Sequence, residues 1–351
     1  MLKNQRRLWS SVALASAVFI VAAGCGSSSS KTATSTTAKA GTETTKAGDV
    51  KATKKLKVAV ITPSAENDVA FSQSMFDALN KVAQDRGANG LEISKSPNLF
   101  NVPDAATAIR DYAKTNDVVI AHGSQYGALL KEIAPQFPKV SFAWGTAADT
   151  FGQPNIFAYE VSADQGGYVA GLIASQVTKK DNIGIVGPVE VGDAKAYIEG
   201  FKKGVAAGKP SVKVTASYIG SFSDVAKAAE AAKTFTAGGA DVLTGTAQMV
   251  AGAVPVADAA GAAWFGNQSN QTSLSKKSVV ASQVYHWEDT LKDIFANVEK
   301  GTLGGKSYVL TLQNKGLVVE YNADYKLDAA AKTKGDDAMK AIIAGTLKTG
   351  A

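Results

Sequence analysis

Residues 57–86 read KVAVITPSAENDVAFSQSMFDALNKVAQDR, and this stretch decides the fold class. An apolar run over 57–62 is followed by a polar loop, and a helical pattern then covers 71–86. Strands that are almost continuously apolar and alternate with helices are typical of parallel sheets covered on both faces. The stretch therefore predicts an α/β protein.

The same strand, loop and helix unit recurs along the chain. The predicted strands lie at 57–62, 91–94, 118–122, 140–144 and 156–159, and then at 183–186, 212–218, 241–244, 263–266 and 279–283. Helical patterns lie between them at 71–86, 104–114, 165–178, 194–206, 225–237 and 249–260. The tail adds a helix at 288–300, strands at 308–311 and 317–321, and a helix at 330–347. Two successive series of this kind predict two doubly wound lobes.

The first 24 residues resemble an export signal. Lys3, Arg6 and Arg7 precede an apolar run over 8–23, and small residues then lead into Cys25, the one cysteine of the chain. This order predicts a signal peptide with a lipobox over 1–24 and lipidation of Cys25. The alternative is an ordinary signal peptide followed by an incidental cysteine.

Residues 25–55 consist mainly of Ser, Thr, Ala, Gly and Lys, so they cannot bury a core. We expect a disordered tether here. Together with an acylated Cys25 it would hold the body on the extracytoplasmic face of the cell membrane.

Charge and composition exclude several classes of protein. The net charge of +6 over 351 residues belongs to the first 55, because 28 cations face 29 anions from residue 56 onward. Only Arg86 and Arg110 of the four arginines fall in the body, which argues against a nucleic-acid groove. One cysteine and two histidines give no support for a disulfide framework or a His-rich metal centre. We expect no metal and no cofactor.

Ligands of open parallel sheets bind beyond the carboxyl ends of the strands. The loops predicted there are rich in glycine, amides, hydroxyls and aromatic rings, and contain no Arg or Lys before the helices begin. Phosphate and carboxylate ligands usually meet Arg or Lys, so this pattern favours a neutral, hydrogen-bonding heteroaromatic solute. The candidate ligand-binding residues are Asp68, Phe71, Ser124, Gln125, Tyr126, Trp144, Phe222, Asp224, Gln248, Gln268, Asn270, Tyr285 and Trp287.

Each candidate also has a purely structural interpretation. The aromatic residues could belong to the core, Asp68 and Asp224 could cap the helices that follow them, and Gln268 and Asn270 could be turn residues. His122, at the end of a buried strand, is interpreted as a hydrogen-bonded core histidine, whereas His286 is better placed to touch a ligand.

Several strings resemble one family, the basic membrane protein (PnrA-like) family of ABC-transporter solute-binding lipoproteins. They are the stretch from Asn67 to Ser74, the helix start at 165–171, the segment from Tyr197 to Phe201, the loop from Tyr218 to Asp224, and residues 239–242. The resemblance spans roughly residues 56–320 in the same order.

The resemblance implies a type I periplasmic binding protein fold with a hinge. It places an N-lobe at 56–160 plus 285–306 and a C-lobe at 161–284 plus 307–351. It further implies that Phe71 and Phe222 sandwich a purine ring and that Asp68 accepts a hydrogen bond from the ligand.

Three departures separate the chain from the nucleoside-binding branch. Trp144 and Gln268 stand where that branch has Asp, and Tyr285 stands where it has Lys. The loop at 265–270 and Trp287 look closer to a base-binding branch, so a purine base or similar heteroaromatic is the favoured ligand, with a nucleoside as the other candidate.

The sequence predicts a monomeric receptor of an ABC importer, which captures solute by lobe closure and passes it to permease and ATPase subunits. A ligand-sensing receptor of the same fold and a binder of another solute, such as a sugar, are the alternatives. An enzyme is disfavoured, because the sequence has no Gly-x-Ser-x-Gly or His-Glu-x-x-His motif. Nucleic-acid binding is disfavoured as well.

Overall fold

The computed structural model describes residues 52–350. The signal peptide, Cys25 and most of the predicted tether lie outside these residues. The described chain begins with an anchored segment, since the Asn89 side chain donates to the Ala52 carbonyl oxygen at 2.8 Å. The Thr53 and Lys54 amides donate to Glu299 Oε1 at 3.2 and 3.3 Å. The prediction of a disordered tether that reaches residue 55 is therefore wrong for its last four residues.

Within the described residues, the first sheet has six strands in the order β11-β5-β4-β3-β1-β2, all parallel to their neighbours. The strands are β1 (Leu56–Ile61), β2 (Leu91–Ser96), β3 (Val118–His122), β4 (Ser141–Gly145), β5 (Ile156–Val161) and β11 (Ser307–Leu310). Together with α1 (Phe71–Asp85), α2 (Val102–Ala113), α3 (Gly127–Ile133) and α8 (Glu288–Glu299), we call this part the first lobe.

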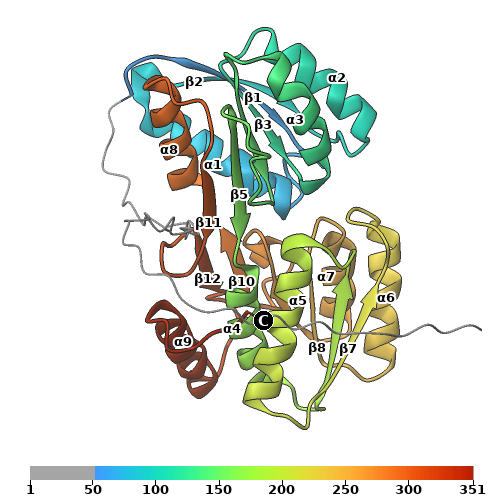
Figure 1. Cartoon of the computed structure of the whole chain (residues 1–351). Coiled ribbons are helices and arrows are strands. Elements are labelled where there is room, and N and C mark those ends of the chain that lie inside the picture. The colour runs from blue at the N-terminus through green and yellow to red at the C-terminus, as the bar shows by residue number, and fades with distance from the viewer. Residues whose placement is uncertain (1–51, 351) are drawn as a thin grey trace, which may run out of the picture. The chain divides into compact units, whose positions relative to one another are not determined.

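Both faces of this sheet are buried, as its apolar strands require. In β1, Val58 and Val60 pack in the cluster that contains α1 and α8, while Ala59 and Ile61 pack in the cluster that contains α2 and α3. Figure 1 shows the two helix pairs on opposite sides of the sheet. Alternate side chains of a strand point to opposite faces of the sheet, and both faces are buried here. The run at 57–62 is therefore apolar along almost its whole length.

The second sheet, also six-stranded in the part of the chain described, has the order β12-β10-β9-β8-β6-β7. Its strands are β6 (Asn182–Gly187), β7 (Lys213–Tyr218), β8 (Val242–Gly245), β9 (Ala263–Gly266), β10 (Val279–Tyr285) and β12 (Leu317–Tyr321). Only β12 is antiparallel, against β10. With α4 (Ala163–Val177), α5 (Gly192–Gly208), α6 (Val225–Ala237), α7 (Val250–Ala259) and α9 (Ala329–Ile343), it forms the second lobe. Two sheets of this kind confirm the predicted doubly wound α/β fold.

The chain passes between the lobes three times: after β5, after β10 and after β11. The third passage differs from the predicted lobe boundary at 306/307. Strand β11 pairs with β5 through Tyr308 and Tyr159, so residues 307–310 belong to the first sheet. The sequence of this short strand carries no mark of which sheet it joins, because either edge could accept it.

Helices α4 and α5 pack backbone against backbone. A Cβ atom added at Gly171 would collide with the carbonyl oxygen of Phe201, and one added at Gly204 would collide with that of Tyr168. Glycine is required at such a close approach, because no other residue lacks the Cβ atom. We call this contact the glycine seam. It fixes the position of α5, whose first turn carries a residue of the site described next.

Candidate ligand-binding site

A pocket lies between the two lobes, and the empty space in it, its solvent-open mouth included, is about 410 Å³. It opens beyond the carboxyl ends of parallel strands in both sheets, where ligands of such sheets bind. The first lobe contributes Pro63, Phe71, Phe100, Gly123, Ser124, Gln125 and Thr146. The second lobe contributes Asp193, Ala194, Phe222, Ala247, Gln248 and Gln268.

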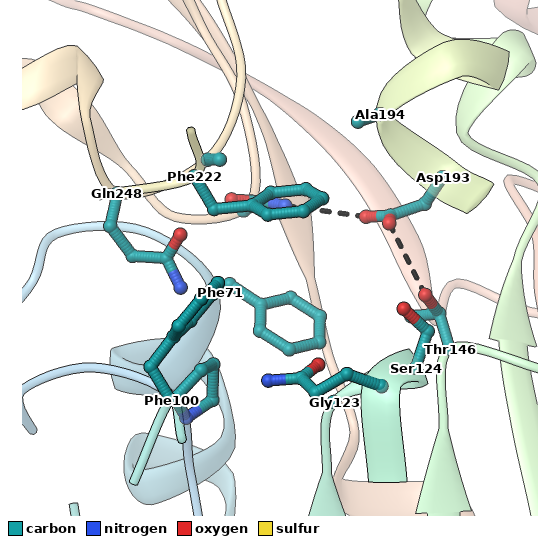
Figure 2. A pocket seen from close by; sticks show the side chains of 13 residues that line it. Phe71, Phe100, Gly123, Ser124, Thr146, Asp193, Ala194, Phe222 and Gln248 are labelled. Atoms are coloured by element: carbon teal, nitrogen blue, oxygen red, sulfur yellow. Dashed lines mark hydrogen bonds between the residues drawn. The ribbon is translucent and has the colours of Figure 1, made fainter. Parts of the chain in front are cut away.

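Aromatic rings enter the pocket from both lobes. Figure 2 shows Phe222 on the side of the second lobe, with Phe71 and Phe100 on the facing side. Phe71 is the first residue of α1, and Phe222 lies in the loop between β7 and α6. The Met249 amide donates to the Phe222 carbonyl oxygen at 3.0 Å, which holds this loop against the start of α7.

The Phe71 ring rests on His122. Their ring centroids are 3.9 Å apart and their planes differ by 10°. His122 Nε2 lies 3.2 Å from the Phe71 carbonyl oxygen, which can only accept, so Nε2 carries the proton. Nδ1 then accepts from the Tyr159 hydroxyl at 3.0 Å. Burial lowers the pKa of His122 to about 3, so the imidazole is neutral. His122 is thus the buried core histidine that the sequence predicted.

Three amide atoms on the pocket wall have no hydrogen-bond partner within residues 52–350. They are Gln125 Nε2, Gln248 Oε1 and Gln268 Oε1. Buried polar atoms in native proteins are usually paired, and an unpaired one costs free energy. One hydrogen-bond donor and two acceptors on residues that line the pocket are therefore left unpaired within the described chain.

Asp193 is a site residue that the sequence analysis missed. It lies in the first turn of α5, and its Oδ1 accepts from Thr146 Oγ1 of the first lobe at 3.2 Å. Its Oδ2 accepts from Gln268 Nε2 at 3.2 Å and from the Tyr285 hydroxyl at 3.1 Å. Burial raises the pKa of this carboxyl, while the hydrogen bonds from Gln268, Tyr285 and Thr146 act in the opposite direction. Following the chain from Gly187 through the next loop into the helix would have indicated Asp193.

The architecture and the pocket can now be compared with known proteins. Residues 55–347 match the family model named Bmp, described as ABC transporter substrate-binding protein PnrA-like. The chain belongs to the Bmp family. Proteins of this family bind substrates for ABC transporters, which work with permease and ATPase subunits, and theirs is a transport role rather than a catalytic one.

Relatives of this Bmp-family chain differ in their named ligands. A purine-binding protein of Brucella abortus is 27% identical over 241 residues, which cover 68% of each chain. An ABC transporter nucleoside-binding protein of Lactococcus lactis is 26% identical over 307 residues, 80% of this chain and 86% of the relative. The solved structure of an ABC transporter solute-binding protein from Conexibacter woesei superposes with a TM-score of 0.69 at 24% identity, covering 84% of this chain and 98% of that one. This likeness confirms the predicted type I periplasmic binding protein fold.

Six of the predicted site residues line the pocket of the Bmp-family chain. They are Phe71, Ser124, Gln125, Phe222, Gln248 and Gln268. Thr146 and Phe100 line it too, although the sequence analysis did not single them out. Phe100 is an aromatic residue in the loop that follows the carboxyl end of β2, and this position in the sequence is the signal by which it could have been found.

The two predicted aspartates cap helices beside the pocket. Asp68 Oδ1 accepts from the amides of Ala70 and Gln73 at 2.9 and 3.0 Å, and its Oδ2 accepts from the Ser72 amide at 3.0 Å. Asp224 accepts from the Lys227 amide at 2.9 Å. Neither lines the pocket, and their geometry is that of the capping role left open above. Contact of Asp68 with ligand stays a prediction.

The predicted aromatic residues outside the pocket are buried and have satisfied polar atoms. The Tyr126 hydroxyl donates to the Leu99 carbonyl oxygen at 2.8 Å, and Trp144 Nε1 donates to that of Asp149 at 2.9 Å. Trp287 Nε1 donates to Ser74 Oγ at 2.9 Å. These three side chains lie in the hydrophobic clusters of the core and do not line the pocket.

The last two candidates act elsewhere. Tyr285 is buried and contacts Asp193 rather than the pocket space. Asn270 is exposed, and its side chain donates to Glu320 Oε2 at 2.7 Å.

Two further searches cover the described residues only. No helix among them is long and apolar enough to cross a membrane. No group of three or more His, Cys, Asp or Glu side chains among them could hold a metal ion.

Proposed function

We propose that this Bmp-family protein captures a purine-like heteroaromatic solute between its lobes and delivers it to an ABC importer. The observation that carries the proposal is the pairing of Phe71 and Phe222, which enter one pocket from the two lobes. Two aromatic faces on opposite walls suit a flat ring, which gains dispersion and stacking energy from both.

The polar groups of the wall agree with such a ring. The donor at Gln125 and the acceptors at Gln248 and Gln268 match the carbonyl and N–H edges of a purine base. The purine and nucleoside ligands named for two relatives point in the same direction. Gln268 and Tyr285 are neutral, whereas the nucleoside-binding branch of the family that the chain resembles has Asp and Lys at these positions. This difference favours a free base over a nucleoside as the ligand.

Calorimetric titration of the full chain in mild detergent tests this proposal. Bases, nucleosides, sugars and amino acids are titrated separately. We expect measurable binding of at least one purine base, and its loss in Phe222→Ala. Phe137→Ala serves as the matched control, because Phe137 is partly buried but does not line the pocket. Binding of sugars or amino acids alone would refute the purine assignment.

We also propose that Cys25 anchors the protein by lipidation on the extracytoplasmic face of the membrane. The proposal rests on the basic, apolar and small-residue order of the first 24 residues. Mass analysis of the processed N-terminal peptide from membrane fractions tests it. We expect an acylated cysteine as the first residue, and Cys25→Ala should release the protein from the membrane fraction.

A further inference from the structure

We infer that Asp193 selects for ligands that present N–H donor or cationic groups, and against anionic ligands. The inference rests on the proposed function and names its substrate class more closely: amino-substituted, neutral or cationic heteroaromatics. The sequence pattern alone indicated only that the loops at the strand ends contain no Arg or Lys.

Asp193 is the single charged residue among the described residues that line the pocket. All the other lining residues are apolar, amide, hydroxyl or glycine, so the wall contains no cation to balance the carboxylate. The three side chains that donate to it, Thr146, Gln268 and Tyr285, are all neutral. Asp193 is partly buried and, among the described residues that line the pocket, has no cation beside it. Its carboxylate is therefore less well stabilised than one in water, and a hydrogen-bond donor on the ligand would stabilise it.

The two oxygens of the carboxylate are not equally occupied. Side chains take three of its about four lone-pair positions, and the residue's own amide also acts on the carboxylate. Oδ2 accepts two side-chain hydrogen bonds, whereas Oδ1 accepts one, from the Thr146 hydroxyl at 3.2 Å, which is longer than the upper limit of about 3.0 Å usual for an O–H donor. Oδ1 is therefore the atom on which a ligand N–H group would bind.

The neighbouring residues determine that this part of the pocket accepts hydrogen bonds and does not donate them. Because Gln268 Nε2 donates to Asp193, the Oε1 atom of the same amide is left as an acceptor without a partner within residues 52–350. Asp193 and Gln268 thus present two acceptors side by side. An amino group or a ring N–H can donate to these acceptors. A carbonyl oxygen or an anionic oxygen on the ligand would instead be repelled by their lone pairs.

The test compares four planar probes by calorimetric titration of the full chain at pH 7.5. The probes are 2,6-diaminopurine, adenine, hypoxanthine and urate, which is anionic at this pH. We expect 2,6-diaminopurine to bind roughly 10- to 100-fold more tightly than urate, which is the range of one charge-assisted hydrogen bond. Asp193→Asn should weaken the binding of 2,6-diaminopurine by a similar factor and leave the affinity for urate unchanged or increased.

Asp104→Asn is the matched control, since Asp104 is an exposed acid in the first turn of α2, away from the pocket. It should leave all four affinities unchanged. Equal affinity of the unmodified chain for urate and 2,6-diaminopurine would overturn the inference even if Asp193→Asn failed to fold. An equal loss for both probes in a folded Asp193→Asn would overturn it as well. If no heteroaromatic probe bound at all, the proposed function would fail, and the inference with it.

Discussion

The imidazole of His122 lies flat against the ring of Phe71, with centroids 3.9 Å apart and planes 10° apart. One face of Phe71 is thereby covered by a side chain at the end of a buried strand. The backbone of Phe71 is tied to the same histidine through its carbonyl oxygen. The ring is held in place before any ligand arrives, which reduces the entropy lost on binding.

The pH dependence of folding should carry the signature of His122. Its pKa falls from an ordinary value of 6.5 to about 3 in the fold, because burial disfavours the charged imidazole. The unfolded chain then binds more protons between these pH values, so stability is full above pH 6.5 and declines as pH falls toward 3. The expected slope from this residue is about 1.4 kcal/mol per pH unit.

Urea unfolding at pH 7 and pH 4.5 checks this prediction. His122→Phe, which keeps a planar ring but cannot titrate, should show a smaller loss between the two pH values. An identical loss in the variant and the unmodified chain would show that other groups account for the acid sensitivity.

His286 should titrate in the opposite direction. The Glu288 carboxylate, whose Oε2 lies 3.5 Å from His286 Nδ1, raises the pKa of His286. The contribution of His286 to stability is therefore present below pH 6.5 and is lost as pH rises through the folded value. The effect should be small, since the side chain is 40% exposed and solvent screens its ion pairs. The chain has two histidines, so NMR titration with a His286→Asn variant assigns both signals. A His286 signal that titrates below 6.5 would contradict the prediction.

Substitution in the glycine seam should destabilise the second lobe. The methyl group of Gly204→Ala would overlap the Tyr168 carbonyl oxygen and force α4 and α5 apart. We expect a loss of about 1–3 kcal/mol in the free energy of unfolding, the usual cost of overpacking. Thermal unfolding measures it against Ala207→Ser, an exposed position on the same helix. Equal stability of the two variants would mean that the helices adjust without strain.

The ion pair of Arg86 and Glu299 should matter more than any surface pair. Their charged atoms lie 2.8 Å apart, and the side chains are only 10% and 4% exposed. Arg86→Ala would leave Glu299 buried without its cation, at an expected cost of about 3–5 kcal/mol. Lys114→Ala, which removes an exposed pair with Asp111, should cost at most about 1 kcal/mol by the same urea titration. Similar losses of unfolding free energy in the two variants would contradict the prediction that the buried ion pair contributes more than an exposed one.

The sequence predicted the sheets well because each buried strand leaves a run of apolar residues. It predicted the lobe of β11 wrongly because four residues carry no information on which edge they join. For the site, Phe71 and Phe222 followed from strand ends and from the resemblance. Trp144 and Trp287 follow strands in the same way, yet they are buried in the core and do not line the pocket. Only the packing of neighbouring helices decides which side a ring faces. Asp193 was missed because a loop separates it from the end of its strand. Its neighbours Thr146 and Tyr285 are distant in the sequence and approach it only in the folded protein.

The glycine seam has a mechanical consequence. Helix α4 starts at Ala163, directly after the passage from β5 into the second lobe. At the glycine seam the backbones of α4 and α5 are in direct contact, with no side chains between them. We therefore expect a rotation about that passage to move α5 together with α4, and the carboxylate of Asp193 with it. Such a rotation would change the distance between Asp193 and Thr146, which lie on different lobes. We thus expect that a substitution in the glycine seam, far from the pocket, can change affinity without contacting the ligand.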